Sequence, residues 1–205
     1  LGLKGIDTHQ FELGIYNLYV SLAYANKIYT AKLDMLLKLE NRHACILDHA
    51  ENLSQDPEKI KQLAKLANKQ EDWGKAAAHS IRLQQVQPDM WQGYWWAGHA
   101  YKNLSLYDEA RKEFQLLQEL LPKNHRGLEG MVNVYQYEQD WKSAAVFAEK
   151  LFKKFPDIAV SYALMITSLK GNNQIDEAIH YAQEFVKKFP ELELAHRYLA
   201  VTMCQ

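Results

Sequence analysis

The chain has 205 residues, and its 24 Lys and Arg side chains against 25 Asp and Glu give a formal net charge of −1. This balance excludes the global basic bias of a nucleic-acid-binding domain and also an acidic tail. Two cysteines, Cys45 and Cys204, are too few for a disulfide framework, and no run approaches the roughly 18 consecutive apolar residues of a transmembrane helix. We therefore expect a cytoplasmic protein that binds no nucleic acid and does not span a membrane.

Residues 1–56 carry two helical patterns, over 11–29 and 31–53, that lack the landmarks of the rest of the chain. They predict an N-terminal helical hairpin or a degenerate repeat that covers one end of the fold. The alternative is that the aromatic side chains of this region dock a partner or a second copy, which would give a homodimer through the N-terminal helices. These side chains are Phe11, Tyr16, Tyr19, Tyr24 and Tyr29.

His43, Cys45 and His49 are the nearest approach to a metal cluster in the sequence. Cys45 and His49 stand four residues apart, on one face of a predicted helix, as zinc ligands can. Two ligands from one helix are too few, and no matching pair is evident elsewhere in the sequence. We predict no metal and no other cofactor.

From residue 57 onward, prolines recur at a fixed spacing of 34 residues. Proline inside a helix removes a backbone hydrogen bond and clashes with the preceding turn, so each of these prolines marks a helix end. A period of this length is typical of stacked repeats. The prolines are Pro88, Pro122, Pro156 and Pro190.

In the frame 57–90, 91–124, 125–158 and 159–192, other residue types also recur once per unit. Each unit holds a first and a second amphipathic helix of roughly 13 residues, too short to bury a core alone, so stability must come from stacking neighbours. The recurring residues are the alanines Ala76, Ala110, Ala144 and Ala178, and the bulky residues before them, Trp73, Tyr107, Trp141 and Ile175.

Local signals mark where these helices begin and end. Asp56 before Pro57 is typical of an N-cap followed by proline at the first helical position. Asp89 and Asp157 follow period prolines, and we expect them to cap the next first helices. The polar break over 171–174 separates the two helices of one unit. The apolar stripes that we assign to the core include Leu63, Leu83, Tyr101, Leu117, Leu151 and Phe185.

These residues resemble the tetratricopeptide repeat, whose pattern is W-x2-L-G-x2-Y, then A-x3-F, then P. The resemblance covers about 57–205 and is best in 91–124. It implies an all-α fold, a right-handed α-α superhelix (solenoid) of stacked helix-turn-helix repeats, with an incomplete repeat or capping helix over 193–205. The matching residues in 91–124 are Tyr94, Ala97, Gly98, Tyr101, Ala110, Phe114 and Pro122.

The resemblance also implies a binding groove, because in this family the first helices line a concave face, chiefly through their second, fifth, ninth, twelfth and thirteenth positions. In this chain those positions are basic and rich in amides around one large aromatic residue, Trp95. A basic wall attracts an anionic ligand, amides bond the backbone of an extended peptide, and Trp95 is the expected anchor. The predicted binding residues are Lys61, Lys65, Lys69, Trp95, His99, Lys102, Arg126, Asn133, Tyr137 and Lys170.

No glycine-rich phosphate loop, paired catalytic carboxylate motif or nucleophile elbow occurs in the sequence. We therefore predict a non-catalytic interaction scaffold that holds an extended acidic or polar segment of a partner protein in the groove. One alternative is the targeting or substrate-recruiting arm of a larger enzyme of glycosyltransferase or sulfotransferase type. It is motivated by a chain that begins at Leu1 and ends within a repeat, as a fragment would. The other alternative is a self-associating structural subunit.

Overall fold

The computed structural model describes residues 55–204, which contain α-helices and no strand. The prediction of an all-α array is confirmed over these residues. The predicted hairpin of residues 1–56, with its aromatic side chains and the possible homodimer, lies outside the described residues, as do His43, Cys45 and His49. Within 55–204, no helix is both long and apolar enough to cross a membrane.

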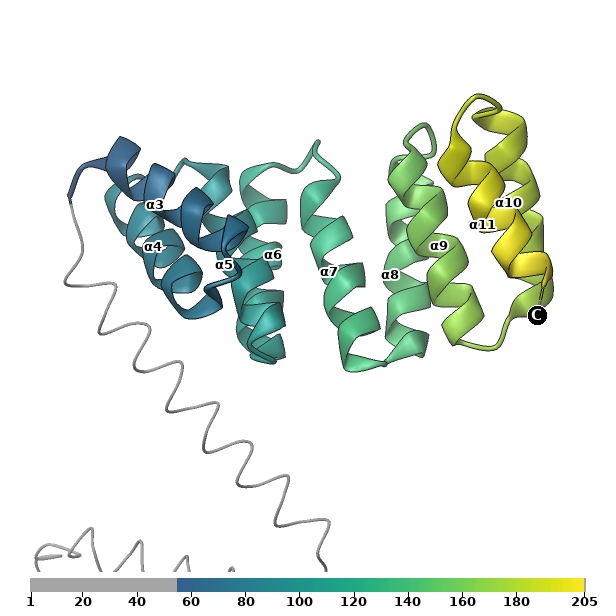
Figure 1. Ribbon diagram of the computed structural model, residues 1–205, viewed down its shortest axis with the longest axis horizontal. Helices are drawn as coiled ribbons and strands as arrows, with labels where there is room; N and C mark the ends of the chain where they lie inside the picture. The colour runs from purple at the N-terminus through teal and green to yellow at the C-terminus, as the bar shows by residue number, and fades with distance from the viewer. Residues whose placement is uncertain (1–54, 205) are drawn as a thin grey trace, which may run out of the picture. The chain divides into compact units, whose positions relative to one another are not determined.

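The helices follow one another in pairs along the array (Figure 1). In each pair a first helix of 13 residues precedes a second helix of 14 residues, and α11 stands alone at the end. The helices are α3 (Pro57–Lys69), α4 (Trp73–Val86), α5 (Trp91–Asn103), α6 (Tyr107–Leu120), α7 (Arg126–Glu138), α8 (Trp141–Lys154), α9 (Ala159–Gly171), α10 (Ile175–Lys188) and α11 (Glu193–Met203).

The prolines at the 34-residue period do mark helix ends. Each of the second helices α4, α6, α8 and α10 ends two residues before one of them. In α4, the last helical residue is Val86 and the proline is Pro88. The residue between them is already extended, as expected before a proline because the Pro Cδ disfavours helical backbone there.

Aspartate side chains cap three of the helices. Asp56 accepts a hydrogen bond from the backbone N–H of Glu58 (3.1 Å), and Pro57 is the first residue of α3, as predicted. Asp72 and Asp140 cap α4 and α8 by accepting from backbone N–H groups three residues further on. Each cap satisfies a donor that a helix start otherwise leaves unpaired.

The expectation that Asp89 and Asp157 cap first helices is wrong. The N-cap positions of α5 and α9 are Met90 and Ile158, one residue later, and neither helix has a side-chain cap. The loops after the prolines are one residue longer than the prediction assumed, which carries both aspartates past the cap position. Asp157 instead pairs with Lys188, 2.6 Å away.

The turn between the two helices of a pair has the same backbone in every pair. One residue in each turn adopts a positive φ of 57° to 63°, and none of them is glycine. The predicted polar break at 171–174 is one of these turns. The positive-φ residues are Glu71, Ser105, Gln139 and Asn173, which stand 34 residues apart.

The core lies between the first and second helices. All four recurring alanines are fully buried, and their small side chains let adjacent helices approach closely. The first helices also contact one another directly, α3 with α5, α5 with α7, α7 with α9 and α9 with α11. Of the apolar residues assigned to the core, Leu63 is only half-buried; those at most 1% exposed are Leu83, Tyr101, Leu117, Leu151 and Phe185.

Candidate functional site

All the predicted binding residues lie on first helices, and we call the surface that they share the first-helix face. Its members come from α3, α5, α7 and α9, which pack side by side. Helix α3 carries Lys61, Lys65 and Lys69, α5 carries Trp95, His99 and Lys102, α7 carries Arg126, Asn133 and Tyr137, and α9 carries Lys170.

Two tryptophans, a histidine and an arginine make ring contacts at the junction of α5 and α7. The guanidinium of Arg126 lies 4.3 Å from the ring centroid of Trp91 and 5.8 Å from that of Trp95. Trp95 also packs edge-on against His99, with ring centroids 4.2 Å apart. We call Trp91, Trp95, His99 and Arg126 the Trp–Arg cluster. It joins three of the predicted residues across two helices.

Phe114 of the second helix α6 supports this cluster from the core. Its ring is fully buried and meets Trp95 and His99 edge-on, with centroids 5.7 and 5.4 Å away. Edge-to-face aromatic contacts of this kind add stability beyond the burial of area. The orientation of the cluster is therefore fixed by the packing of one helix pair.

The guanidinium of Arg126 makes no ion pair or hydrogen bond to any residue within 55–204; its position comes from the two tryptophan rings. Its backbone N–H, by contrast, donates to the side chain of Asn124 at 3.0 Å. An arginine side chain has five N–H donors and no acceptor. The stacked and half-buried guanidinium thus keeps its donors available for an incoming acceptor.

Lys102 and Tyr137 form a second contact between α5 and α7. The Lys102 Nζ lies 3.7 Å from the Tyr137 ring centroid, with Lys102 itself only 7% exposed. Burial lowers the pKa of Lys102, because the charged ammonium loses hydration. The tyrosine ring compensates part of that loss, since a cation over an aromatic face is attracted to it.

His99 contributes a neutral ring rather than a charge. Burial, helped by the nearby positive charge of Lys102, lowers the pKa of His99 to about 4. Its Nε2 is buried and has no hydrogen-bond partner among the described residues. At neutral pH the ring therefore acts as an aromatic surface beside Trp95.

The face also holds one acid close to the cluster. Glu129, one turn after Arg126 on α7, lies 3.4 Å from His125. Burial raises the pKa of Glu129, and the positive charge of Arg126 partly opposes this effect. The α7 part of the face therefore combines an arginine with a partly buried carboxyl group.

The remaining predicted residues lie outside these ring contacts. Lys61 pairs with Glu58 at 3.3 Å, and Lys170 donates to the backbone carbonyl of Val201 at 3.1 Å. Lys65 and Lys69 are exposed. Asn133 is half-buried on α7. The cations of the face are thus not equivalent, because several already have a partner within the chain.

Sequence reasoning missed Trp91. It precedes Trp95 by one helical turn, a spacing that places two side chains on the same side of a helix. That i, i+4 pair of tryptophans was the available signal. The contact with Arg126 was not available, since it joins residues from neighbouring repeats.

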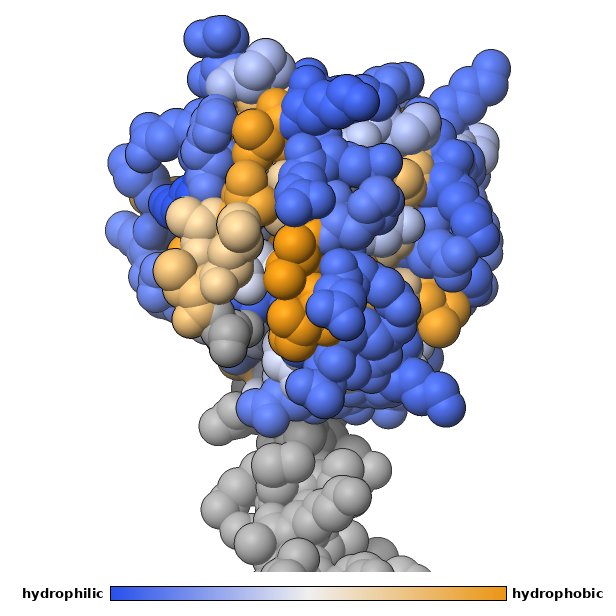
Figure 2. All heavy atoms as spheres, turned by 90° about the vertical axis from the view of Figure 1, so that its right-hand side faces the viewer, coloured by the Kyte–Doolittle hydropathy of each residue, from blue (hydrophilic) through white to orange (hydrophobic). Residues whose placement is uncertain are grey.

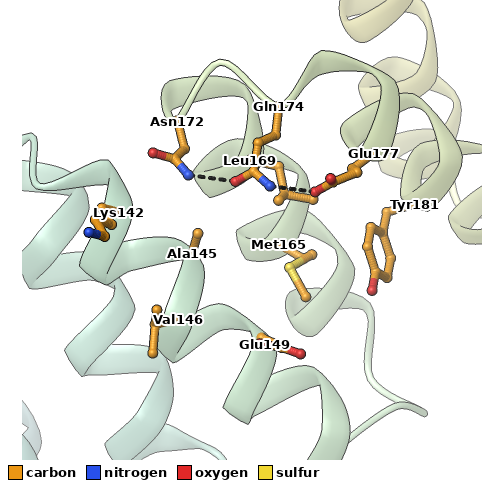
Figure 3. Close-up of a pocket in the computed structure, with 10 residues that line it drawn as sticks. All are labelled: Lys142, Ala145, Val146, Glu149, Met165, Leu169, Asn172, Gln174, Glu177 and Tyr181. Atoms are coloured by element: carbon orange, nitrogen blue, oxygen red, sulfur yellow. Dashed lines mark hydrogen bonds between the residues drawn. The ribbon is translucent and has the colours of Figure 1, made fainter.

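A pocket of about 330 Å³ lies between α8, α9 and α10 (Figure 3), and no predicted binding residue lines it. Its floor includes Met165 and Leu169, which are already buried. On its rim, Gln174 donates to the Glu177 carboxylate at 2.6 Å. Because these rim groups bond each other, the first-helix face is the stronger candidate for a binding site.

Comparison with solved structures identifies the fold. No family model and no curated protein matches the sequence. MamA of Desulfovibrio magneticus RS-1 superposes with a TM-score of 0.58 at 18% identity, over 71% of this chain and 82% of that chain. A tetratricopeptide repeat protein of Parabacteroides merdae gives 0.57 at 13% identity, over 90% and 84%. This chain has the tetratricopeptide-repeat fold.

A third similar structure of the tetratricopeptide-repeat fold is YrrB, described as a protein of this kind with an unusual peptide-binding site. It superposes with a TM-score of 0.53 at 16% identity, over 78% of this chain and 82% of that chain. At such identities the likeness establishes the fold alone. The tetratricopeptide-repeat fold places the first-helix face, and the residues on it must carry any functional argument.

Proposed function

We propose that this tetratricopeptide-repeat array is a non-catalytic scaffold that binds an extended, acidic segment of a partner protein on its first-helix face. The observation that carries the proposal is the Arg126 guanidinium, stacked on Trp91 and Trp95 without an acceptor among the described residues. An arginine held in this way is a receptor for a carboxylate.

The chemistry of the guanidinium explains the choice of ligand. Stacking uses the flat face of the group and leaves its N–H donors in the plane, where they match the two oxygens of a carboxylate. Because the tryptophans already restrict the side chain, binding an Asp or Glu of the partner costs little further side-chain entropy. The partly dehydrated surroundings strengthen the resulting charge-assisted hydrogen bonds.

The tryptophans supply the apolar part of the interface. Trp and Arg are the residue types most enriched among interface hot spots, and here they occur in one contact. Among the amides of α7, Gln136 already donates to Ser168 at 2.9 Å and so contributes to the stacking of α7 and α9. Asn133 is the remaining α7 amide for the peptide backbone. The peptide-binding site named in the description of YrrB supports a peptide as the class of ligand.

The test is a selection of random dodecapeptides displayed on phage against the wild-type chain. We expect enriched sequences to carry Asp or Glu within a few residues of an aromatic or aliphatic residue. A Trp95→Ala variant should lose most of the affinity for these peptides. Lys65→Ala should act mainly through salt-dependent attraction, because Lys65 is exposed on α3, away from the Trp–Arg cluster.

The outcome decides between clear alternatives. Enrichment without acidic residues would contradict the assigned ligand, and equal affinity for the wild type and Trp95→Ala would contradict the assigned surface. Folding of each variant is checked by circular dichroism, since Trp95 also contacts the buried Phe114 ring. An Arg126→Ala variant provides a second test of the surface, because Arg126 makes no side-chain hydrogen bond within the described residues.

A further inference from the structure

Helix α11 occupies the position of a first helix but has no second helix after it in the described residues. Its placement repeats a contact seen earlier in the array. The Tyr94 hydroxyl of α5 donates to the carbonyl of Pro88 at 2.9 Å. Three periods later, His196 of α11 lies 2.7 Å from the carbonyl of Pro190 through its Nε2. The loop before α11 therefore seats this helix as the loops before other first helices do.

The equivalent residues of other first helices are buried, whereas those of α11 are exposed. Ala200 is exposed, although one, two and four periods before it Ile166, Val132 and Ala64 are fully buried. Met203 is 61% exposed, although Leu169, one period before it, is 5% exposed.

His196 follows the same rule, since it is exposed whereas Tyr162, one period earlier, is 4% exposed. We call His196, Ala200 and Met203 the α11 face; their spacing of four and three residues places them on one side of the helix. Figure 2 looks onto the end of the array that contains α11 and shows a band of apolar side chains between hydrophilic ones.

In the preceding pairs, these positions are covered by second helices. Gly98, three periods before Ala200, faces the Phe114 ring of α6 so closely that a Cβ there would lie 2.6 Å from it. Tyr135, two periods before Met203, stacks on Phe147 of α8 with centroids 5.1 Å apart. The interface that covers a first helix is thus a second helix with its apolar side inward.

We propose that the α11 face docks an amphipathic helix of a partner protein, in the way that second helices cover first helices within the array. The partner helix is expected to present small residues followed by an aromatic or leucine. In α10 these are the fully buried Ala178, Ala182 and Phe185. The proposal continues an interface that this chain forms in each of its helix pairs, and it does not depend on the function proposed for the first-helix face.

The probe is a synthetic peptide with the sequence of residues 174–189, which contains α10. A lactam bridge between Glu184 and Lys188, both exposed, stabilises the helix without touching its apolar side. We expect saturable binding to the chain by fluorescence anisotropy, together with slower amide exchange in α11. Ala200→Asp should weaken binding at least tenfold, because it places a charge in the apolar contact. Arg197→Asp, on the same helix but outside the α11 face, should change it less than twofold.

Three results would overturn the proposal. The first is no binding by the wild-type chain, and the second is binding that Ala200→Asp leaves unchanged. The third is a dimeric mass in light scattering that Met203→Lys returns to a monomer, which would make a second copy the occupant. Since Ala200 and Met203 are exposed, both variants should fold, and thermal unfolding checks this.

Discussion

The Phe114 ring lies against the backbone of Gly130, so closely that a Cβ at Gly130 would come within 2.2 Å of it. Gly98 faces the same ring, at 2.6 Å from its added Cβ. The ring of one second helix thus fills the space that two successive first helices leave open at their glycines. The same ring supports Trp95 and His99, so core packing and the Trp–Arg cluster share one side chain.

Gly130→Ala should therefore lower the free energy of unfolding by about 1–3 kcal/mol, the usual cost of forcing extra volume into a packed core. The measurement is the midpoint of urea unfolding. Gly74→Ala is the matched control, because an added Cβ there meets nothing nearer than 4.0 Å. That variant should gain about 0.5–1 kcal/mol, since alanine is the better helix former. Equal effects of the two variants would contradict the packing described here.

The buried carboxyl group of Glu113 makes stability depend on pH. Burial raises its pKa to about 7 from 4.5, despite the hydrogen bond that Gln84 donates to it at 2.7 Å. A raised pKa means that the folded state disfavours the charged form, so stability is lost as pH rises from about 4.5 to about 7. Glu113→Gln should remove this loss and stabilise the chain at pH 8 by on the order of 1–3 kcal/mol.

The difference between Glu113→Gln and wild type should shrink as the pH falls toward 4.5, because the wild-type carboxyl is then neutral in both states. Comparing the two proteins at each pH cancels the contribution of His99, which titrates in the opposite sense. Glu119→Gln, at an exposed position on the same helix, should stay within about 0.5 kcal/mol of wild type. A pH-independent difference would contradict the assignment to Glu113.

The turn residue Gln139 adopts a φ of 61°, where an L-side chain is strained and glycine is not. Gln139→Gly should raise the free energy of unfolding by about 0.5–1 kcal/mol, after the entropy that glycine adds to the unfolded chain is subtracted. The same change at Gln183, exposed within α10, should lower it by about 1 kcal/mol. Thermal unfolding of the two variants should therefore shift in opposite directions.

Arg126→Lys should weaken the binding of an acidic peptide selected on the wild-type chain by about tenfold, equal to about 1.4 kcal/mol. Lysine keeps the charge but loses both the planar stacking on Trp91 and the paired donors. Lys65→Arg is the control, since Lys65 is exposed on α3 and takes no part in the Trp–Arg cluster. Isothermal titration at two salt concentrations measures both variants; an Arg126→Lys affinity equal to wild type would remove Arg126 from the binding site.

The sequence alone predicted the stacked helix pairs and the positions of most helix ends. These features depend on residues close together in the chain: Pro88 stops α4, Asp56 caps α3, and the period of 34 residues repeats the same local signals. The caps assigned to Asp89 and Asp157 failed because a loop of one extra residue is not encoded in the identity of the aspartate. Local chemistry therefore determined the elements, with an error of one residue at two helix starts.

Only the tertiary structure decided what the side chains on those helices do. The sequence presents Lys61, Lys102, Arg126 and Lys170 alike, as cations on first helices. In the folded chain, Lys102 is buried under Tyr137 and Arg126 is stacked on Trp91. These contacts join residues that are about one repeat apart, and burial then sets the pKa of each group. The distance across neighbouring helices is a property of packing, which is why residue types and spacing could place the binding face but not select its free donors.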